Sequence, residues 1–249
     1  MTGDRPGRVW GLIASQAARR GGRVSAADAC AAVVTAAGVT GAWLSAAGDG
    51  DAGHLMRVTD AVSERLAELA LTLGEGPSLD ASASGGPALA SDLGTAEAAG
   101  RWPGFAPAAR QVGAGAVFVF PLRIGAIGAG VLGLYRARPG PLSASQLGDA
   151  LVFADTATLL LLDAQDQGAG AAGTGPAGQP EGLALHRAEI DQATGMLTEQ
   201  LAITITDAFA RLRAYAYAYD RPLADVAGDI VARRLRLRPD VGTPRDGEA

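Results

Sequence analysis

The sequence predicts an α+β protein in which an antiparallel sheet with flanking helices is followed by an all-α domain of three helices. Two observations lead to this prediction. Residues 25–163 mix alternating apolar runs with helical spacing, whereas residues 182–238 carry helical spacing alone. Between them, residues 165–181 (QDQGAGAAGTGPAGQPE) show no apolar periodicity, which is typical of a flexible linker. We therefore expect an extension at 1–24, a sheet domain at 25–163, a linker at 164–181, a helical domain at 182–238 and a tail at 239–249.

The sheet domain begins with a predicted helix at residues 25–37, whose first residue, Ser25, suits an N-cap. A strand-like run at 40–46 and an alternating run at 54–58 follow, one on each side of a GDGD turn. Helical spacing returns at 60–71. The turn-rich stretch at 73–80 then predicts a loop.

The second half of this domain is predicted to complete the sheet. A short strand at 88–92 and a short helix at 105–111 come first. Residues 116–124 and 130–137 are two β-rich runs separated by a glycine-rich segment, which predicts a hairpin. A long helix at 142–162, capped by Ser143, closes the domain. Because few strand pairs have the crossover helices of a parallel sheet, we expect an antiparallel sheet with helices packed on one face.

The helical domain shows three amphipathic segments. Residues 183–201 place their apolar side chains on one stripe, which predicts a helix with one buried face. Thr204 and Asp207 match a capping box that opens a second helix, and Pro222 suits the first turn of a third. The three helices are expected to pack together, because none would persist alone.

Composition bounds the class of protein. Of the 249 residues 48% are apolar and 19% are charged, which is enough apolar side chain for a buried core. The single cysteine, Cys30, cannot form an internal disulfide, and no Cys or His spacing suits a zinc site. No export signal is visible, and the longest apolar stretch is interrupted by Asp155. We expect a cytoplasmic protein without a membrane span, metal or cofactor.

Few residues are available for catalysis. The chain has two histidines, His54 and His186, and no lysine, so it contains no Walker A, HExxH or GxSxG motif. Residues 168–173 (GAGAAG) match a dinucleotide fingerprint but follow no strand, which indicates a chance match in the linker. We predict no catalytic residue and no enzyme activity. The net charge is −5, yet residues 182–238 have a slight basic excess, so any site for a polyanion is expected there.

Three motifs of the helical domain together resemble the ANTAR family. They are residues 190–197 (IDQATGML), 208–213 (AFARLR) and 222–227 (PLADVA), in the order and at the spacing of that domain's three helices. The resemblance implies a protein that binds paired RNA stem-loops, prevents transcription termination and forms homodimers.

This resemblance also guides the assignment of residues. Ala193 and Gly195 are expected to permit close helix packing, with Phe209, Leu212, Val226 and Ala227 in a small core. RNA contact is assigned to polar and basic side chains that we expect to be exposed, because arginine suits phosphate and aromatic rings stack on unpaired bases. The predicted RNA-binding residues are Gln192, Thr194, Arg211, Arg213, Tyr217 and Arg221.

Two further expectations concern the same domain. Tyr215 and Tyr219 are expected to pack, which leaves Tyr217 as the outward ring. Many family members carry lysine at the position of Thr194, so one phosphate contact is lost here. The arginines at 233–238 either replace it or form a solvated helix end.

The sheet domain resembles GAF domains that accompany ANTAR domains in actinobacterial proteins. The likeness is carried by residues 73–77 (LGEGP), 101–105 (RWPGF), 118–122 (FVFPL) and 130–135 (GVLGLY). It implies a sensory domain with a small-molecule ligand, or a merely packed core or dimer surface. Ser78 stands where related sequences often have cysteine, which argues against a thiol-based redox or chromophore site.

The leading hypothesis is therefore an RNA-binding transcription antitermination regulator with a GAF sensory domain. Two alternatives remain at this point. Three small helices of near-neutral charge also suit a DNA-binding regulator of the helix-turn-helix type, or a ligand-sensing module that contacts only proteins.

Overall fold

The computed structural model describes residues 4–48, 50–125, 127–168, 181–219 and 221–238. The chain divides into an N-terminal unit (Met1–Ala184) and a C-terminal unit (Leu185–Ala249), and each is described by itself. Most of the predicted linker and the predicted tail at 239–249 lie outside the described residues. So do the side chains of His54 and His186.

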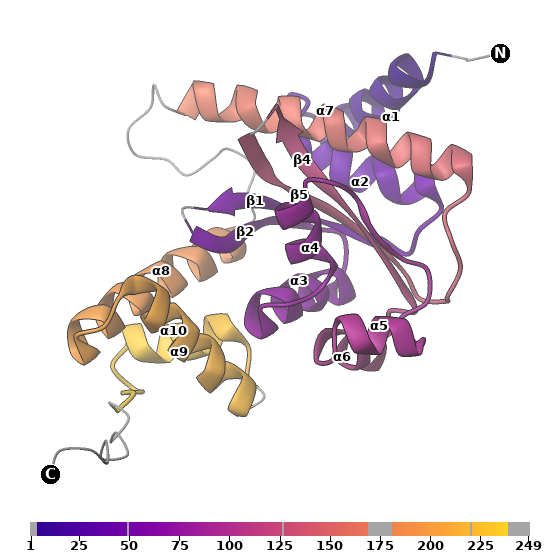
Figure 1. The fold of residues 1–249 in the computed structure, drawn as a ribbon. Coiled ribbons are helices and arrows are strands. Elements are labelled where there is room, and N and C mark those ends of the chain that lie inside the picture. Colours follow the sequence, from indigo (N-terminus) through magenta and orange to yellow (C-terminus); the bar gives the residue numbers. More distant parts are fainter. Residues whose placement is uncertain (1–3, 49, 126, 169–180, 220, 239–249) are drawn as a thin grey trace, which may run out of the picture. The chain divides into compact units, whose positions relative to one another are not determined.

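The N-terminal unit is built on one five-stranded antiparallel sheet with the order β2-β1-β5-β4-β3 (Figure 1). The hairpin predicted at 116–137 is confirmed: its strands pair from Ala116 opposite Arg136 to Ile124 opposite Ile127. The strands are β1 (Gly41–Gly48), β2 (Gly50–Val58), β3 (Ala88–Ala90), β4 (Ala116–Ile124) and β5 (Ile127–Arg136).

Local capping signals explain where most of the helices begin. Ser25 and Asp28 form a capping box at the start of α2, and the Asp60 side chain accepts from the Ser63 N–H at the start of α3. The stretch predicted as a loop at 73–80 instead includes the start of a helix, with Pro77 in its first turn. The helices are α1 (Arg5–Arg20), α2 (Ala26–Ala37), α3 (Ala61–Leu73), α4 (Pro77–Ser84), α5 (Ala96–Arg101), α6 (Phe105–Gln111) and α7 (Ala144–Gly168).

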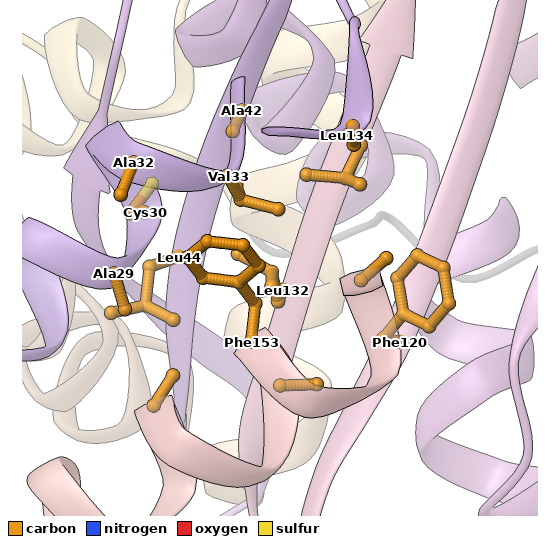
Figure 2. Close-up of a cluster of buried hydrophobic side chains, with 14 of the residues drawn as sticks. Ala29, Cys30, Ala32, Val33, Ala42, Leu44, Phe120, Leu132, Leu134 and Phe153 are labelled. Carbon is orange, nitrogen blue, oxygen red and sulfur yellow. The ribbon is translucent and has the colours of Figure 1, made fainter. Parts of the chain in front are cut away.

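Helices cover both faces of the sheet, so the expectation of one covered face is wrong. Side chains alternate along β4: Phe118 and Phe120 join the cluster beneath α1, α2 and α7, whereas Val117 and Val119 join the cluster beneath α3 to α6. Figure 2 shows the first cluster, in which Phe153 lies between side chains of α2, such as Val33, and the strand residues Leu44 and Leu132. Burial on both faces explains why residues 116–120 are apolar without a break.

Cys30 belongs to this first cluster and has no exposed surface. Burial raises the pKa of its thiol to about 12. The thiol therefore stays protonated at neutral pH, and Cys30 acts as a small core side chain.

The stretch predicted as an N-terminal extension contains α1, which packs against α2 and α7. Its Val9, Ile13 and Ala17 are buried. Polar contacts hold both ends: Arg5 and Arg8 pair with the buried Asp149 of α7 at 3.0 and 2.5 Å, and Arg20 pairs with Asp28 of α2 at 2.8 Å. Much of residues 1–24 is therefore part of the folded unit.

The Arg20 and Asp28 pair predicts a loss of stability in acid. Burial alone would raise the pKa of Asp28. The hydrogen bonds from Arg20 and Ser25 lower this pKa by more than burial raises it, so the net shift is downward. A carboxyl group with a lowered folded-state pKa stabilises the fold above its unfolded pKa, near 3.8, and that contribution is lost as the pH falls through its folded-state pKa. We expect Asp28→Asn to flatten the decline in urea midpoint of the N-terminal unit in this acidic range. An unchanged pH profile would contradict this.

Two sequence motifs of this unit are joined by side-chain contacts. Glu75, in the LGEGP motif, accepts hydrogen bonds from the backbone N–H groups of Gly104 and Phe105, both at 2.6 Å. Asp80 accepts from Arg101 at 2.8 Å and from the Trp102 indole at 3.1 Å. Glu75 of LGEGP and Asp80, three residues after that motif, therefore both satisfy polar groups of the RWPGF segment.

The C-terminal unit consists of α8 (Glu181–Leu201), which starts just before the unit boundary, α9 (Ile205–Ala218) and α10 (Leu223–Val231). The predicted cap is confirmed, because the Thr204 side chain accepts from the Asp207 N–H. Each helix buries one stripe, as expected from the spacing. The fully buried apolar side chains are Ala193 and Leu197 on α8, Ala208 and Leu212 on α9, and Leu223, Val226 and Ala227 on α10.

Candidate nucleic-acid interface

The C-terminal half of α9 presents a basic and aromatic face. Arg213 and Tyr217 are four residues apart and so lie on the same side of the helix. The Arg213 guanidinium carbon lies 5.8 Å from the centre of the Phe209 ring, which holds the arginine along the helix surface. An arginine beside an exposed ring can contact a phosphate while the ring meets a base.

The tyrosines are arranged as their spacing predicts. The rings of Tyr215 and Tyr219 stack with centres 4.3 Å apart. Tyr217 is 65% exposed, so its ring points outward. Tyr219 is nearly as exposed, which the helical spacing did not reveal.

The two predicted RNA-binding residues of α8 differ in their exposure. Gln192 is exposed on α8. Thr194 is buried, and its hydroxyl donates to the Ile190 carbonyl at 2.8 Å, so the expectation that it is exposed is wrong. Its position one residue after Ala193 and three before Leu197 puts it on the packed stripe.

Arg211 and Arg221 make contacts within the protein. Arg211 donates to the Arg238 carbonyl at 3.4 Å, which ties α9 to the segment after α10. Arg221 pairs with Asp229 at 2.6 Å, and Arg234 pairs with the same carboxylate at 2.8 Å. The hydrogen bonds from Arg221 and Arg234 lower the pKa of Asp229, and the bond to Asp229 raises the pKa of Arg221. Both arginines therefore take part in contacts that stabilise this unit.

A second feature of this unit was not predicted. An open groove of about 680 Å³ lies between α8 and the segment that follows α10. Gln200 of α8 donates to the Leu237 carbonyl at 2.8 Å, and Leu237 is buried, so this segment is folded back onto α8. The groove is lined by Gly195, Met196, Glu199 and Gln200 on one side and by Ile230, Arg233, Leu235 and Arg236 on the other.

Gly195 does not have the role expected from the sequence. It is exposed, and a Cβ atom built on it meets no other atom within 4 Å. Ala193 is fully buried and fits the expectation of close packing, but Gly195 does not. The cluster of arginines at 233–238 was the one sequence signal near the groove.

In the N-terminal unit, the space between the sheet and α3 to α6 is filled by large side chains that include Trp43, Leu66 and Phe105. The Trp43 indole N–H is buried and makes no hydrogen bond within the described residues. Tyr135 donates to Asp60 at 3.2 Å in the same region, and burial raises the pKa of Tyr135 to about 12. The Trp43 indole N–H and the Tyr135 hydroxyl are therefore polar atoms within a largely apolar cluster.

The described residues contain no group of three or more His, Cys, Asp or Glu side chains placed to hold a metal ion. Among the described helices, none is both long and apolar enough to span a membrane.

Solved structures resemble this fold. The GAF domain of a phosphoenolpyruvate-protein phosphotransferase from Coxiella burnetii matches with a TM-score of 0.50 and 14% identity, over 66% of this chain and 98% of that one. The GAF domain of the Acinetobacter phosphoenolpyruvate-protein phosphotransferase gives 0.49 and 15%, over 67% and 96%. The match to the Coxiella burnetii domain assigns the GAF fold to the sheet unit. A shared fold does not by itself show a shared activity.

The C-terminal unit is identified from its sequence. The model of the ANTAR domain family matches residues 184–231, a range that takes in nearly all of α8 and the whole of α9 and α10. The chain therefore carries an ANTAR domain after a domain of the GAF fold. Comparison with curated proteins gave no match.

Proposed function

We propose that this chain is a cytoplasmic, homodimeric regulator of transcription antitermination, in which the ANTAR domain binds paired RNA stem-loops under the control of the GAF unit. The observation that carries the proposal is the ANTAR family match over α8 to α10. The face formed by Arg213 and the exposed Tyr217 supports it, because it offers a cation for phosphate and a ring for an unpaired base. Gln192 remains a proposed contact on α8, and Arg211 and Arg221 are proposed to act from the edges of this surface.

The test uses the full chain and a synthetic RNA with two stem-loops. Arg213→Ala is expected to weaken binding about three- to tenfold and to reduce the slope of log K against log salt by about 0.7 to 0.9, as for the loss of one phosphate contact. Titrations at several salt concentrations measure both quantities. Arg19→Ala is the matched control, because it removes the same charge from an exposed position of α1 in the other unit. Equal effects of the two variants would remove Arg213 from the proposed surface.

Competition with duplex DNA separates this proposal from the helix-turn-helix alternative. We expect the labelled RNA to be displaced by unlabelled stem-loops but not by duplex DNA at a similar concentration of nucleotides. Displacement by DNA at equal concentration would favour a DNA-binding regulator. A complete lack of salt-dependent binding to either would favour the protein-interaction module.

The GAF unit is proposed to supply the signal by binding a small molecule. The support is the buried Trp43 indole N–H, which is a hydrogen-bond donor without an acceptor among the described residues. A ligand with an acceptor group would satisfy it once the side chains that fill this space had moved.

A further inference from the structure

We propose that the groove between α8 and the segment after α10 is a nucleotide-binding site, which receives one unpaired RNA base on its apolar floor and holds the adjoining phosphates with Arg233 and Arg236. The inference rests on the proposed RNA binding and adds a second contact surface to the α9 face. None of the six residues predicted from the sequence lines this groove.

The first supporting observation is that the groove has two fixed walls. One wall is the helix α8, and the other is the segment after α10, held to α8 by the hydrogen bond from Gln200 to Leu237 and to α9 by the contact from Arg211 to Arg238. Its volume of about 680 Å³ falls within the range of about 300 to 1,000 Å³ found for small-ligand sites. A single base with its sugar fits a space of this size, and the open side leaves a path for the rest of the strand.

The second observation is the exposed Gly195 in the body of α8. Glycine destabilises a helix interior relative to alanine, and it is usually kept there for close packing. Here no atom lies within 4 Å of the Cβ position, so packing within the described residues gives no reason for glycine. Its effect is to widen the groove, because any larger side chain at this position would project into open space beside Met196.

The third observation is the backbone of Arg233. Its φ of 59° lies in the left-handed region, where glycine is the usual residue after a helix, and Ala202 is the other described non-glycine residue with a positive φ. The Arg233 and Arg234 N–H groups donate to the Ile230 and Asp229 carbonyls, which terminates α10. Glycine would end the helix with less strain. An arginine at this position therefore has a cost in stability, and its side chain lines the groove.

The chemistry of the lining selects the occupant. Met196, Ile230 and Leu235 give an apolar floor, and the methionine sulfur makes favourable contacts with aromatic rings. Arg233 and Arg236 are exposed and give the groove two positive charges, whereas Glu199 gives it one negative charge. The groove is therefore complementary to an anion. An apolar floor beside planar guanidinium groups suits an unpaired base with its phosphates.

The decisive variant is Arg233→Gly, because it separates binding from stability. Glycine relieves the backbone, so hydrogen exchange in α10 of the full chain is expected to slow. RNA binding is expected to weaken about three- to tenfold, with a salt slope reduced by about 0.7 to 0.9. Arg234→Ala is the matched control: it removes the same charge one residue away, from a side chain that pairs with Asp229 and does not line the groove.

A second variant tests the occupancy of the groove by a base. Gly195→Gln places a neutral side chain in the open space and favours the helix. We expect it to weaken binding of the two-stem-loop RNA about tenfold, as expected for the loss of one stacked base. Abasic substitution of the loop positions, one at a time, identifies the base concerned. Removal of this base should weaken RNA binding by the wild-type protein. It should have little further effect on RNA binding by the Gly195→Gln variant.

The outcomes distinguish the two proposals. If the wild-type chain binds no stem-loop RNA, the proposed function fails. If it binds RNA and Arg213→Ala weakens binding, but Arg233→Gly and Arg234→Ala have equal effects, the groove proposal alone fails. The groove proposal would also be overturned if Gly195→Gln changed the sedimentation of the chain and left its RNA affinity intact. That result would mean that the groove holds a second copy of this chain.

Discussion

Leu212→Ala is expected to unfold the C-terminal unit and abolish RNA binding. Leu212 lies in the middle of α9 and has no exposed surface. Truncating a buried leucine to alanine costs about 2 to 5 kcal/mol, because the transfer free energy is lost and a cavity remains. A three-helix unit of this size is stabilised by only about 3 to 5 kcal/mol, so this one change removes most or all of it.

The distribution of tryptophan makes the result easy to localise. Trp10, Trp43 and Trp102 all belong to the N-terminal unit, so their fluorescence should keep its native spectrum in the variant. Hydrogen exchange of peptides from α9 and α10 should become fast. Ile205→Ala is the control, because Ile205 is on the same helix and 67% exposed. Retention of slow exchange in Leu212→Ala would show that the core of this unit is elsewhere.

Gly133→Ala is expected to destabilise the N-terminal unit by about 3 kcal/mol or more, the upper end for an overpacked core. Gly133 of β5 lies opposite Trp43 of β1, and a Cβ atom at this position would be 2.0 Å from a carbon of the indole ring. Trp43 is fully buried, so the ring cannot move aside without disturbing its neighbours. The second glycine of the GVLGLY motif is therefore explained by the tryptophan on the adjacent strand.

Urea unfolding followed by tryptophan fluorescence measures this effect, with an expected decrease of about 1 to 2 M in the midpoint. Gly128→Ala on the same strand is the control, since its Cβ position meets no atom within 4 Å. A midpoint for Gly133→Ala equal to that of the control would mean that the indole ring repacks freely.

Much of the fold follows from local signals in the sequence. The caps at Ser25, Asp60 and Thr204 set the starts of three helices, and the glycine-rich turn sets the hairpin. Two short helices were missed, although Pro77 and Thr95 are start signals of the same kind. They are short enough that turn residues dominate their sequence. The covering of both sheet faces was also readable, because the unbroken apolar run at 116–120 is typical of a strand buried on both sides.

The candidate site was less predictable. Helical spacing correctly places Tyr217 outward. The same spacing puts Thr194 on the buried stripe, but Thr194 was assigned to RNA contact from its position in the family motif. The groove depends on the return of residues 235–237 to α8, held by the hydrogen bond from Gln200. No periodicity indicates such a contact, because it joins residues 37 positions apart. For the same reason, the exposure of Gly195 could not be derived from its neighbours in the chain.

The two outer strands of the sheet have a consequence for association. At one edge, β3 pairs only with residues 117–119 of β4, and Pro121 farther along β4 has no N–H to offer a new strand. At the other edge, the pairing of β1 with β2 is interrupted by register shifts, which twist an edge away from regular pairing. Both borders are poor templates for β-augmentation, so copies of this chain are expected to join through helices and not through a shared, continuous sheet.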